Sequence, residues 1–335
     1  MTNRDTSIDI LRSLGLLLII LVHIHPPFIL SQIRCFDVPL MLFVSGLTAS
    51  GKQIHNYLEY IKKRTLRLVL PVWIFLAFYL SAFYFAQDYI LPTRYLTGKM
   101  VLRSFLLLDE SIGYVWIIRV FLLTMLITPL LQRISNQLKT PIRLCSYIVI
   151  TFATIEFLYS FVYGHNSFLD VVIKDYLIYT LGYSVPYVIG LKMRYLAKSV
   201  IGSYLLYLLI LTLCFFVLYI TVHGMPINIS PSYKEPPRHY FLMYGCFVSV
   251  LLWTLKNHIV NIAGSKVGYM LSFIGQNTIW IYLWHMPFVL LINATSLNWE
   301  IKYITVFSIS IVIYSLQYIL VKKSNNPFLN RYLIG

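Results

Sequence analysis

Long apolar runs recur along almost the whole chain, and they restrict its possible fold more than any other feature. A helix that crosses a membrane needs roughly 20 mainly apolar residues. About ten such runs lie near residues 9–27, 35–50, 68–90, 113–132, 143–163, 175–191, 200–222, 239–255, 268–292 and 300–321. With 59% hydrophobic and 12% charged residues, a water-soluble globule would expose too much apolar surface. The sequence therefore predicts an all-α polytopic membrane protein with about ten transmembrane helices.

The charged residues predict the orientation of these helices. The net charge of +15 could indicate a nucleic-acid partner, but the cations occur in short clusters between the apolar runs. With a cytoplasmic N-terminus, the inner side holds about twice as many Lys and Arg as the outer side, as the positive-inside rule requires. The inner cations include Arg64, Arg67, Arg133, Lys139 and Arg143, and the outer ones Arg34, Lys234 and Arg238. Both termini are therefore predicted to be cytoplasmic.

Domain organisation follows from the loops between the runs. No loop is long enough for a separate soluble domain, so residues 1–335 are predicted to form one membrane domain without a fused soluble part. The four cysteines show no CxxC pair, and the histidines show no metal-binding spacing. We expect neither a disulfide framework nor a metal site.

The first apolar run carries ionisable side chains inside a segment that should lie in lipid. At 100° per residue, Arg12 and His23 differ by about 20° beyond three turns and lie about 16 Å apart on one helical face. Asp9 is a possible partner for Arg12 at i−3. Pro26 should end the helix. Such residues usually face a polar cavity, although headgroup contact by Arg12 and one interhelical hydrogen bond from His23 would also explain them.

Five sequence blocks resemble acyltransferase family 3, the bacterial integral-membrane acyltransferases, and they occur in the family's order. They are IDILRSLGLLLIILVH (8–23), VPLMLFVSGL (38–47), KKRTLRLVLPVW (62–73), GYVWIIRVFLLTMLITPLL (113–131) and IGQNTIWIYLWHMPFV (274–289). The first has the family's ten residues between the cation and the histidine. Leu47 replaces an aromatic residue of the family's second block, and Arg119 is unusual in the fourth. Gly46 in the second block most simply permits close helix packing.

The resemblance implies a multi-pass enzyme of the bacterial inner membrane. Members of this family take acetyl from cytoplasmic acetyl-coenzyme A (acetyl-CoA) and transfer it to a hydroxyl of a surface polysaccharide or its lipid-linked precursor, without a metal. The chain is similar to the stand-alone type of this family, which has no fused hydrolase-like domain. The alternatives from other classes are a transporter or flippase of acyl groups or lipid-linked sugars, and a sensor or structural membrane subunit.

Acetyl transfer needs a base for the hydroxyl proton and cations for the donor's phosphates. His23 is our candidate, either as general base or as a transiently acylated nucleophile. Arg64 and Arg67, three residues apart, suit the phosphates of coenzyme A, and Arg12 its pyrophosphate or pantetheine arm. Basic residues at an inner helix end would also be expected from topology alone.

A base works better with an orienting carboxylate, and few acids lie within the apolar runs. Glu156 is the preferred catalytic candidate, and we expect it to face the interior of the bundle because an ionised carboxylate is costly in lipid. Asp37 and Asp109, near the outer surface, are alternatives. A structural hydrogen bond or a pair with Arg119 would explain Glu156 equally well.

Two further residues are predicted to meet the acceptor. His285 could contact the carbohydrate or support His23, although a polar contact between helices would also explain it. Trp116 could line the sugar or acyl pocket with its flat apolar face. Most tryptophans near a membrane interface are only anchors.

Overall fold

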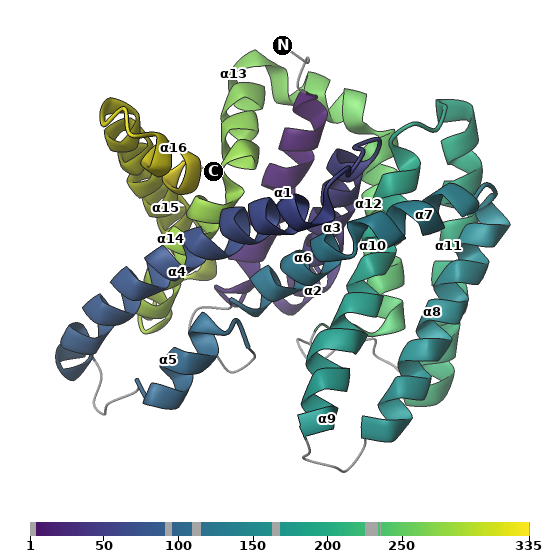
Figure 1. Cartoon of the computed structure of the whole chain (residues 1–335), viewed down its shortest axis with the longest axis horizontal. Helices are drawn as coiled ribbons and strands as arrows, with labels where there is room; N and C mark the ends of the chain where they lie inside the picture. Colours follow the sequence, from purple (N-terminus) through teal and green to yellow (C-terminus); the bar gives the residue numbers. More distant parts are fainter. Residues whose placement is uncertain are drawn as a thin grey trace. The chain divides into compact units, whose positions relative to one another are not determined.

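The computed structural model describes residues 5–90, 96–108, 115–162, 168–224, 234 and 236–334, and nearly all of these residues are helical (Figure 1). Within these ranges the chain forms no β-strand, and one isolated β-bridge joins Lys234 and Pro237. Two compact units interleave along the chain. The first comprises Met1–Ile19, Pro27–Gln53 and Ile127–Gly275, and the second Ile20–Pro26, Ile54–Leu126 and Gln276–Gly335.

The first unit is a layered bundle in which α10 has the most helical neighbours. Its helices are most of α1 (Thr6–Val22), α2 (Phe28–Ile33), α3 (Asp37–Ala49), α7 (Thr128–Gln137), α8 (Pro141–Val162), α9 (Phe168–Val171), the π-helical segment η1 (Val172–Ile178), α10 (Tyr179–Met193), α11 (Lys198–His223), α12 (His239–Thr254) and α13 (Lys256–Gln276). Helix α10 contacts α3, α7, α8 and α12, and α11 packs against α8 and α12. Helices α8, α10, α11 and α12 run side by side in Figure 1.

Two glycines allow α3 and α10 to approach each other closely. A Cβ atom on Gly46 of α3 would lie 2.1 Å from the carbonyl oxygen of Tyr187, and one on Gly190 of α10 would lie 2.0 Å from the carbonyl oxygen of Phe43. Any larger residue would therefore separate the two backbones. The predicted packing role of Gly46 is confirmed.

The second unit is built around α4 and α14. Its helices are α4 (Tyr57–Ile90), α5 (Gly98–Phe105), α6 (Trp116–Leu126), α14 (Thr278–Asn293), α15 (Trp299–Lys323) and α16 (Pro327–Leu333). Helix α4 contacts α5, α6, α14 and α16, and α14 also packs against α15. The hydroxyls of Tyr57 and Tyr60 donate hydrogen bonds of 2.8 and 2.9 Å to the carbonyl oxygens of Leu126 and Met125. These bonds fix the start of α4 against the end of α6.

Several helices are long and apolar enough to cross a membrane. Among the described residues there are five such segments: Phe28–Ala49, Tyr57–Phe85, Pro141–Val162, Lys198–Val222 and Trp299–Lys323. The number rises to seven if the bent pairs α6 with α7 and α12 with α13 each count as one span, and α14 is a shorter apolar helix. The predicted all-helical membrane architecture is confirmed. The count of ten spans and the cytoplasmic location of both termini stay predictions.

Candidate active site

His23 lies directly after the end of a helix. Helix α1 ends at Val22, and the backbone N–H of His23 donates to the carbonyl oxygen of Ile20 at 3.2 Å, which tightens the last turn. His25 has a φ of 52°, in the left-handed region that a non-glycine residue seldom adopts. The prediction that the helix ends before Pro26 is confirmed. The imidazole of His23 is partly exposed.

His23 meets His285 within the second unit. Nδ1 of His23 lies 2.9 Å from Nε2 of His285, and the two rings stack with centroids 5.1 Å apart at an interplanar angle of 16°. His285 lies in α14 and is fully buried. Asn293 of the same helix donates from its side-chain amide to the carbonyl oxygen of His23 at 2.8 Å. The structure thus brings together two of the histidines that the sequence singled out.

The hydrogen bonds of His285 determine where the protons of the pair lie. Nδ1 of His285 contacts the carbonyl oxygen of Tyr282, and a carbonyl oxygen can only accept. Nδ1 of His285 therefore carries the proton, and in the neutral ring Nε2 is an acceptor. His23 must then donate from Nδ1, so Nε2 of His23 holds a lone pair. A general base requires a lone pair in this position.

Arg12 lies on the part of α1 that belongs to the first unit. Its Nη1 atom is 3.4 Å from Oδ1 of Asp9 and 3.3 Å from the carbonyl oxygen of Gly275. A Cβ atom on Gly275 would lie 1.9 Å from the carbonyl oxygen of Asp9, so a glycine is needed where α13 meets α1. The predicted pair of Arg12 with Asp9 is confirmed. The shared face of Arg12 and His23 stays a prediction.

Arg64 and Arg67 follow each other by nearly one turn of α4, in the second unit. The guanidinium of Arg64 lies 5.3 Å from the ring centroid of Tyr60, while Arg67 is exposed. Lys63 pairs with Glu59 at 2.6 Å, and both side chains are more than half exposed. Glu59 thus offsets part of the positive charge of this turn.

Glu156 pairs with two residues at the start of α12 rather than lying inside the bundle. Its carboxylate is 3.5 Å from Nη1 of Arg238 and 3.4 Å from Nδ1 of His239, and its side chain is 48% exposed. The guanidinium of Arg238 also lies 4.3 Å from the ring centroid of Tyr159. These contacts give Glu156 a local structural role in the first unit. Its predicted role in orienting His23 stays a prediction.

Trp116 is the first residue of α6 and is only 8% exposed. Arg119, one turn later, is also buried at 3% exposure. The predicted acceptor-binding role of Trp116 stays a prediction. Asp109, the alternative acid near the outer surface, lies outside the described residues.

A family model described as an acyltransferase domain, that of acyltransferase family 3, matches residues 5–320, which is nearly the whole chain. The chain belongs to acyltransferase family 3. No curated protein and no solved structure gives a significant match. The predicted family is confirmed, and the protein is a membrane acyltransferase.

The acyltransferase also contains a buried charge cluster that was not predicted from the sequence. Oδ1 of Asp37 lies 2.9 Å from Nζ of Lys234, and Oδ2 contacts Nη1 of Arg34. The three residues are between 1% and 7% exposed. Burial lowers the pKa of Lys234 more than the neighbouring Asp37 carboxylate raises it. The spacing of Arg34 and Asp37 at a helix start was a signal for the first contact, but nothing pointed to Lys234.

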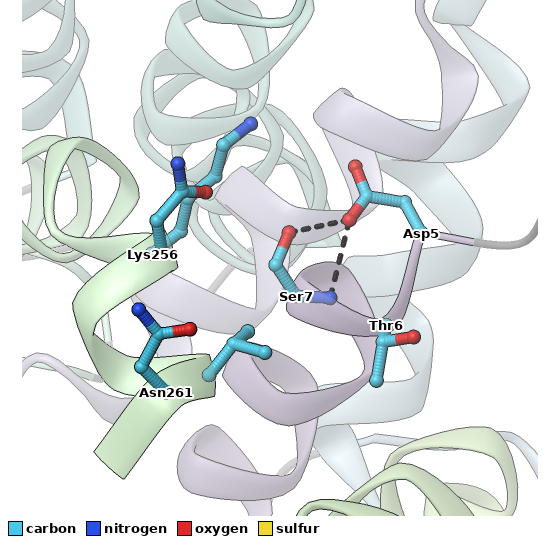
Figure 2. Close-up of a pocket in the computed structure, with 7 residues that line it drawn as sticks. Asp5, Thr6, Ser7, Lys256 and Asn261 are labelled. Atoms are coloured by element: carbon cyan, nitrogen blue, oxygen red, sulfur yellow. Dashed lines mark hydrogen bonds between the residues drawn. The ribbon is translucent and has the colours of Figure 1, made fainter. Parts of the chain in front are cut away.

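A polar pocket of about 320 Å³ lies where α1 of the acyltransferase begins (Figure 2). Asp5 accepts hydrogen bonds from the backbone N–H and the hydroxyl of Ser7 and forms a 2.6 Å ion pair with Arg194. Lys256 and Asn261 of α13 also line it. Burial opposes ionisation of Asp5, but the hydrogen bonds from Ser7 and Arg194 and the charge of Arg194 lower its pKa below the usual value. The network anchors the start of α1.

Proposed function

We propose that the protein is a membrane-bound O-acetyltransferase. It takes acetyl from cytoplasmic acetyl-CoA and transfers it to a hydroxyl of a cell-surface polysaccharide or its lipid-linked precursor, in the inner membrane of a bacterium and without a metal. The observation that carries the proposal is the hydrogen-bonded pair of His23 and His285 in a chain of this family. The pair provides a base at a site where a hydroxyl can be deprotonated.

His23 takes up the proton in this mechanism. Its Nε2 atom accepts the proton of the acceptor hydroxyl while the hydroxyl oxygen attacks the carbonyl carbon of the thioester. The new C–O bond forms, the C–S bond breaks, and the proton passes from His23 to the coenzyme A sulfur. In a two-step route, Nε2 of His23 attacks the thioester carbon and coenzyme A leaves as the thiolate. The acceptor hydroxyl then attacks the acetyl group, the bond from Nε2 to the acetyl carbon breaks, and the hydroxyl proton passes to the thiolate. Both routes need the tautomer that the structure indicates.

His285 positions His23 and stabilises its charged form. When Nε2 of His23 takes up a proton, the ring becomes an imidazolium whose Nδ1–H is directed at Nε2 of His285. The carbonyl oxygen of Tyr282 holds His285 as an acceptor throughout. The aspartate of a Ser-His-Asp triad acts on its histidine in the same way, by fixing the tautomer and ring orientation. A neutral imidazole does this here without burying a second charge.

The donor is bound through its phosphates in this proposal. Arg64 and Arg67 present planar guanidinium groups that can donate two hydrogen bonds each to a phosphate. Arg12 is the candidate for the pyrophosphate or the pantetheine arm, and it keeps 20% side-chain exposure despite its contact with Asp9. All three cations lie on the predicted cytoplasmic side, where acetyl-CoA is found.

The experiment is acetyl transfer by the purified protein from radiolabelled acetyl-CoA to candidate glycans. The His23→Gln variant should lose about 10²- to 10⁴-fold in rate, because general base catalysis is worth that much. His25→Gln is the matched control, since His25 is exposed two residues away and has no assigned role. Full turnover by His23→Gln contradicts the mechanism, and glycan movement without acetylation indicates a transporter.

A further inference from the structure

A basic cavity of about 590 Å³ lies in the first unit, where α7 ends and α8 begins. Its lining consists of three cations and two amides: Arg133, Asn136, Gln137, Lys139 and Arg143. All five residues are exposed. Within the part of the chain that the structure describes, none of the three cations forms an ion pair with a carboxylate. The cavity therefore presents uncompensated positive charge next to amide donors.

The backbone around this cavity is held in place. The side-chain amide of Gln132 donates to the carbonyl oxygens of Ala49 and Lys52 at 2.9 and 3.1 Å, which fixes α7 to the end of α3. Leu131 and Leu138 are buried at 2% and 8% exposure and anchor the same segment. The backbone that carries the cations is thus held by hydrogen bonds and by buried side chains.

The first turn of α8 adds to the positive potential. Thr140 caps this helix, because its hydroxyl accepts from the backbone N–H of Arg143 at 3.4 Å. The N-terminus of a helix carries a partial positive charge and attracts anions. Arg143 therefore lies where the helix itself favours a negative group.

The cavity adjoins the start of a helix that is long and apolar enough to cross a membrane. Helix α8 is one of the candidate membrane spans, and it begins at the cavity. Ile142, Val149 and Ile150 of α8 are 61%, 45% and 65% exposed, which is expected of side chains that face lipid. Leu130 of α7 is also 55% exposed. Exposed aliphatic side chains thus flank the cations, which are on the side that the charge distribution predicts to be cytoplasmic.

We propose that this cavity binds the phosphate headgroup of an anionic phospholipid from the cytoplasmic leaflet. Arg133 and Arg143 bind the phosphate oxygens through paired donors, and Lys139 adds a point charge. Asn136 and Gln137 hydrogen-bond the rest of the headgroup. The acyl chains lie along the exposed aliphatic side chains of α8. A soluble phosphate or nucleotide shares the phosphate chemistry but makes no use of these aliphatic side chains.

The test is native mass spectrometry of the purified full chain titrated with phosphatidylglycerol, with phosphatidylcholine as the neutral lipid. Each cation near an anionic lipid surface contributes about a 5-fold gain in binding. The variant Arg133→Gln/Lys139→Gln/Arg143→Gln should therefore bind phosphatidylglycerol on the order of 100-fold more weakly. The matched control is Lys266→Gln/Lys322→Gln/Lys323→Gln, which removes the same charge from exposed residues that are also predicted to lie on the inner side. It should bind almost as tightly as the unmodified protein.

Loss of inner cations can also change membrane insertion, so a second variant keeps the charge. Arg133→Lys/Arg143→Lys retains every positive charge but loses the paired donors, and an intermediate loss of binding is expected. Equal losses in the cavity variant and the matched control would show a diffuse charge effect and overturn the proposal. If inorganic phosphate displaces phosphatidylglycerol at a concentration similar to that of the lipid, the cavity binds a soluble anion. That result would also overturn the proposal.

Discussion

The buried cluster of Arg34, Asp37 and Lys234 supports a prediction about which of its charges the fold needs most. Two cations and one carboxylate lie together in the first unit, at 4%, 1% and 7% exposure. Asp37 is the shared partner, since both cations and the backbone N–H of Val38 bond to its carboxylate. Among the described residues the cluster carries one excess positive charge.

Asp37→Asn should be far more destabilising than Lys234→Met. Removing the carboxylate charge leaves Arg34 and Lys234 buried without compensation, and breaking a buried ion pair in this way costs about 3 to 5 kcal/mol. Removing Lys234 leaves a neutral pair of Arg34 and Asp37, and replacing an excess buried cation by an apolar chain of similar length costs roughly 1 kcal/mol or less. The two substitutions therefore differ by at least about 2 kcal/mol.

The assay is thermal unfolding of both variants in the same detergent and at the same heating rate, because unfolding of such proteins is often irreversible. Asp37→Asn should unfold several degrees below the unmodified protein, and Lys234→Met close to it. Adding Lys234→Met to Asp37→Asn should recover part of the loss, because one of the two uncompensated cations is then removed. Equal effects of the two single substitutions, or no recovery in the double variant, would refute the conclusion that Asp37 compensates both buried cations.

Three further predictions concern the active site, the start of α1 and the helix packing. His285→Phe should lower kcat roughly 10²-fold with little change in the KM for the acceptor, because His23 loses the group that fixes its tautomer; a raised KM with unchanged kcat would indicate acceptor contact instead. The stabilisation from ionised Asp5 should be complete at neutral pH and disappear as the pH falls through its lowered pKa, and Asp5→Asn should abolish this part of the pH dependence of unfolding. Gly190→Ala should lower the free energy of unfolding by about 1 to 3 kcal/mol because its Cβ meets backbone. Gly202→Ala, in open space on α11, should leave stability unchanged or raise it by up to about 1 kcal/mol. Shifts of the two unfolding midpoints in the same direction would contradict this.

Local sequence patterns predicted the features that depend on neighbouring residues. The contact of Arg12 with Asp9 follows from i−3 spacing in a helix. The end of α1 before Pro26 follows from the steric effect of proline on the preceding residue. Close packing at Gly46 follows from the absence of a side chain. The first two depend on geometry that a single helix already defines, and the third on the lack of a side chain at one residue.

Glu156 shows where such reasoning was insufficient. The cost of a charge in lipid predicted a carboxylate inside the bundle. In the structure, Glu156 instead pairs with Arg238 and His239 at the start of α12, and its side chain is about half exposed. Which partner neutralises a charge depends on the helices that happen to lie next to it. Sequence spacing contains no information on that choice.

The sequence by itself determined the class of protein and supplied the candidates for its reactive side chains, because the length of apolar runs, the placement of cations and the motif residues are all local properties. Only the tertiary structure joined His23 to His285 across 262 positions and Asp37 to Lys234 across 197. These contacts arise from side-chain packing between helices distant along the chain, which fixes the proton position on His23 and the charge balance of the buried cluster.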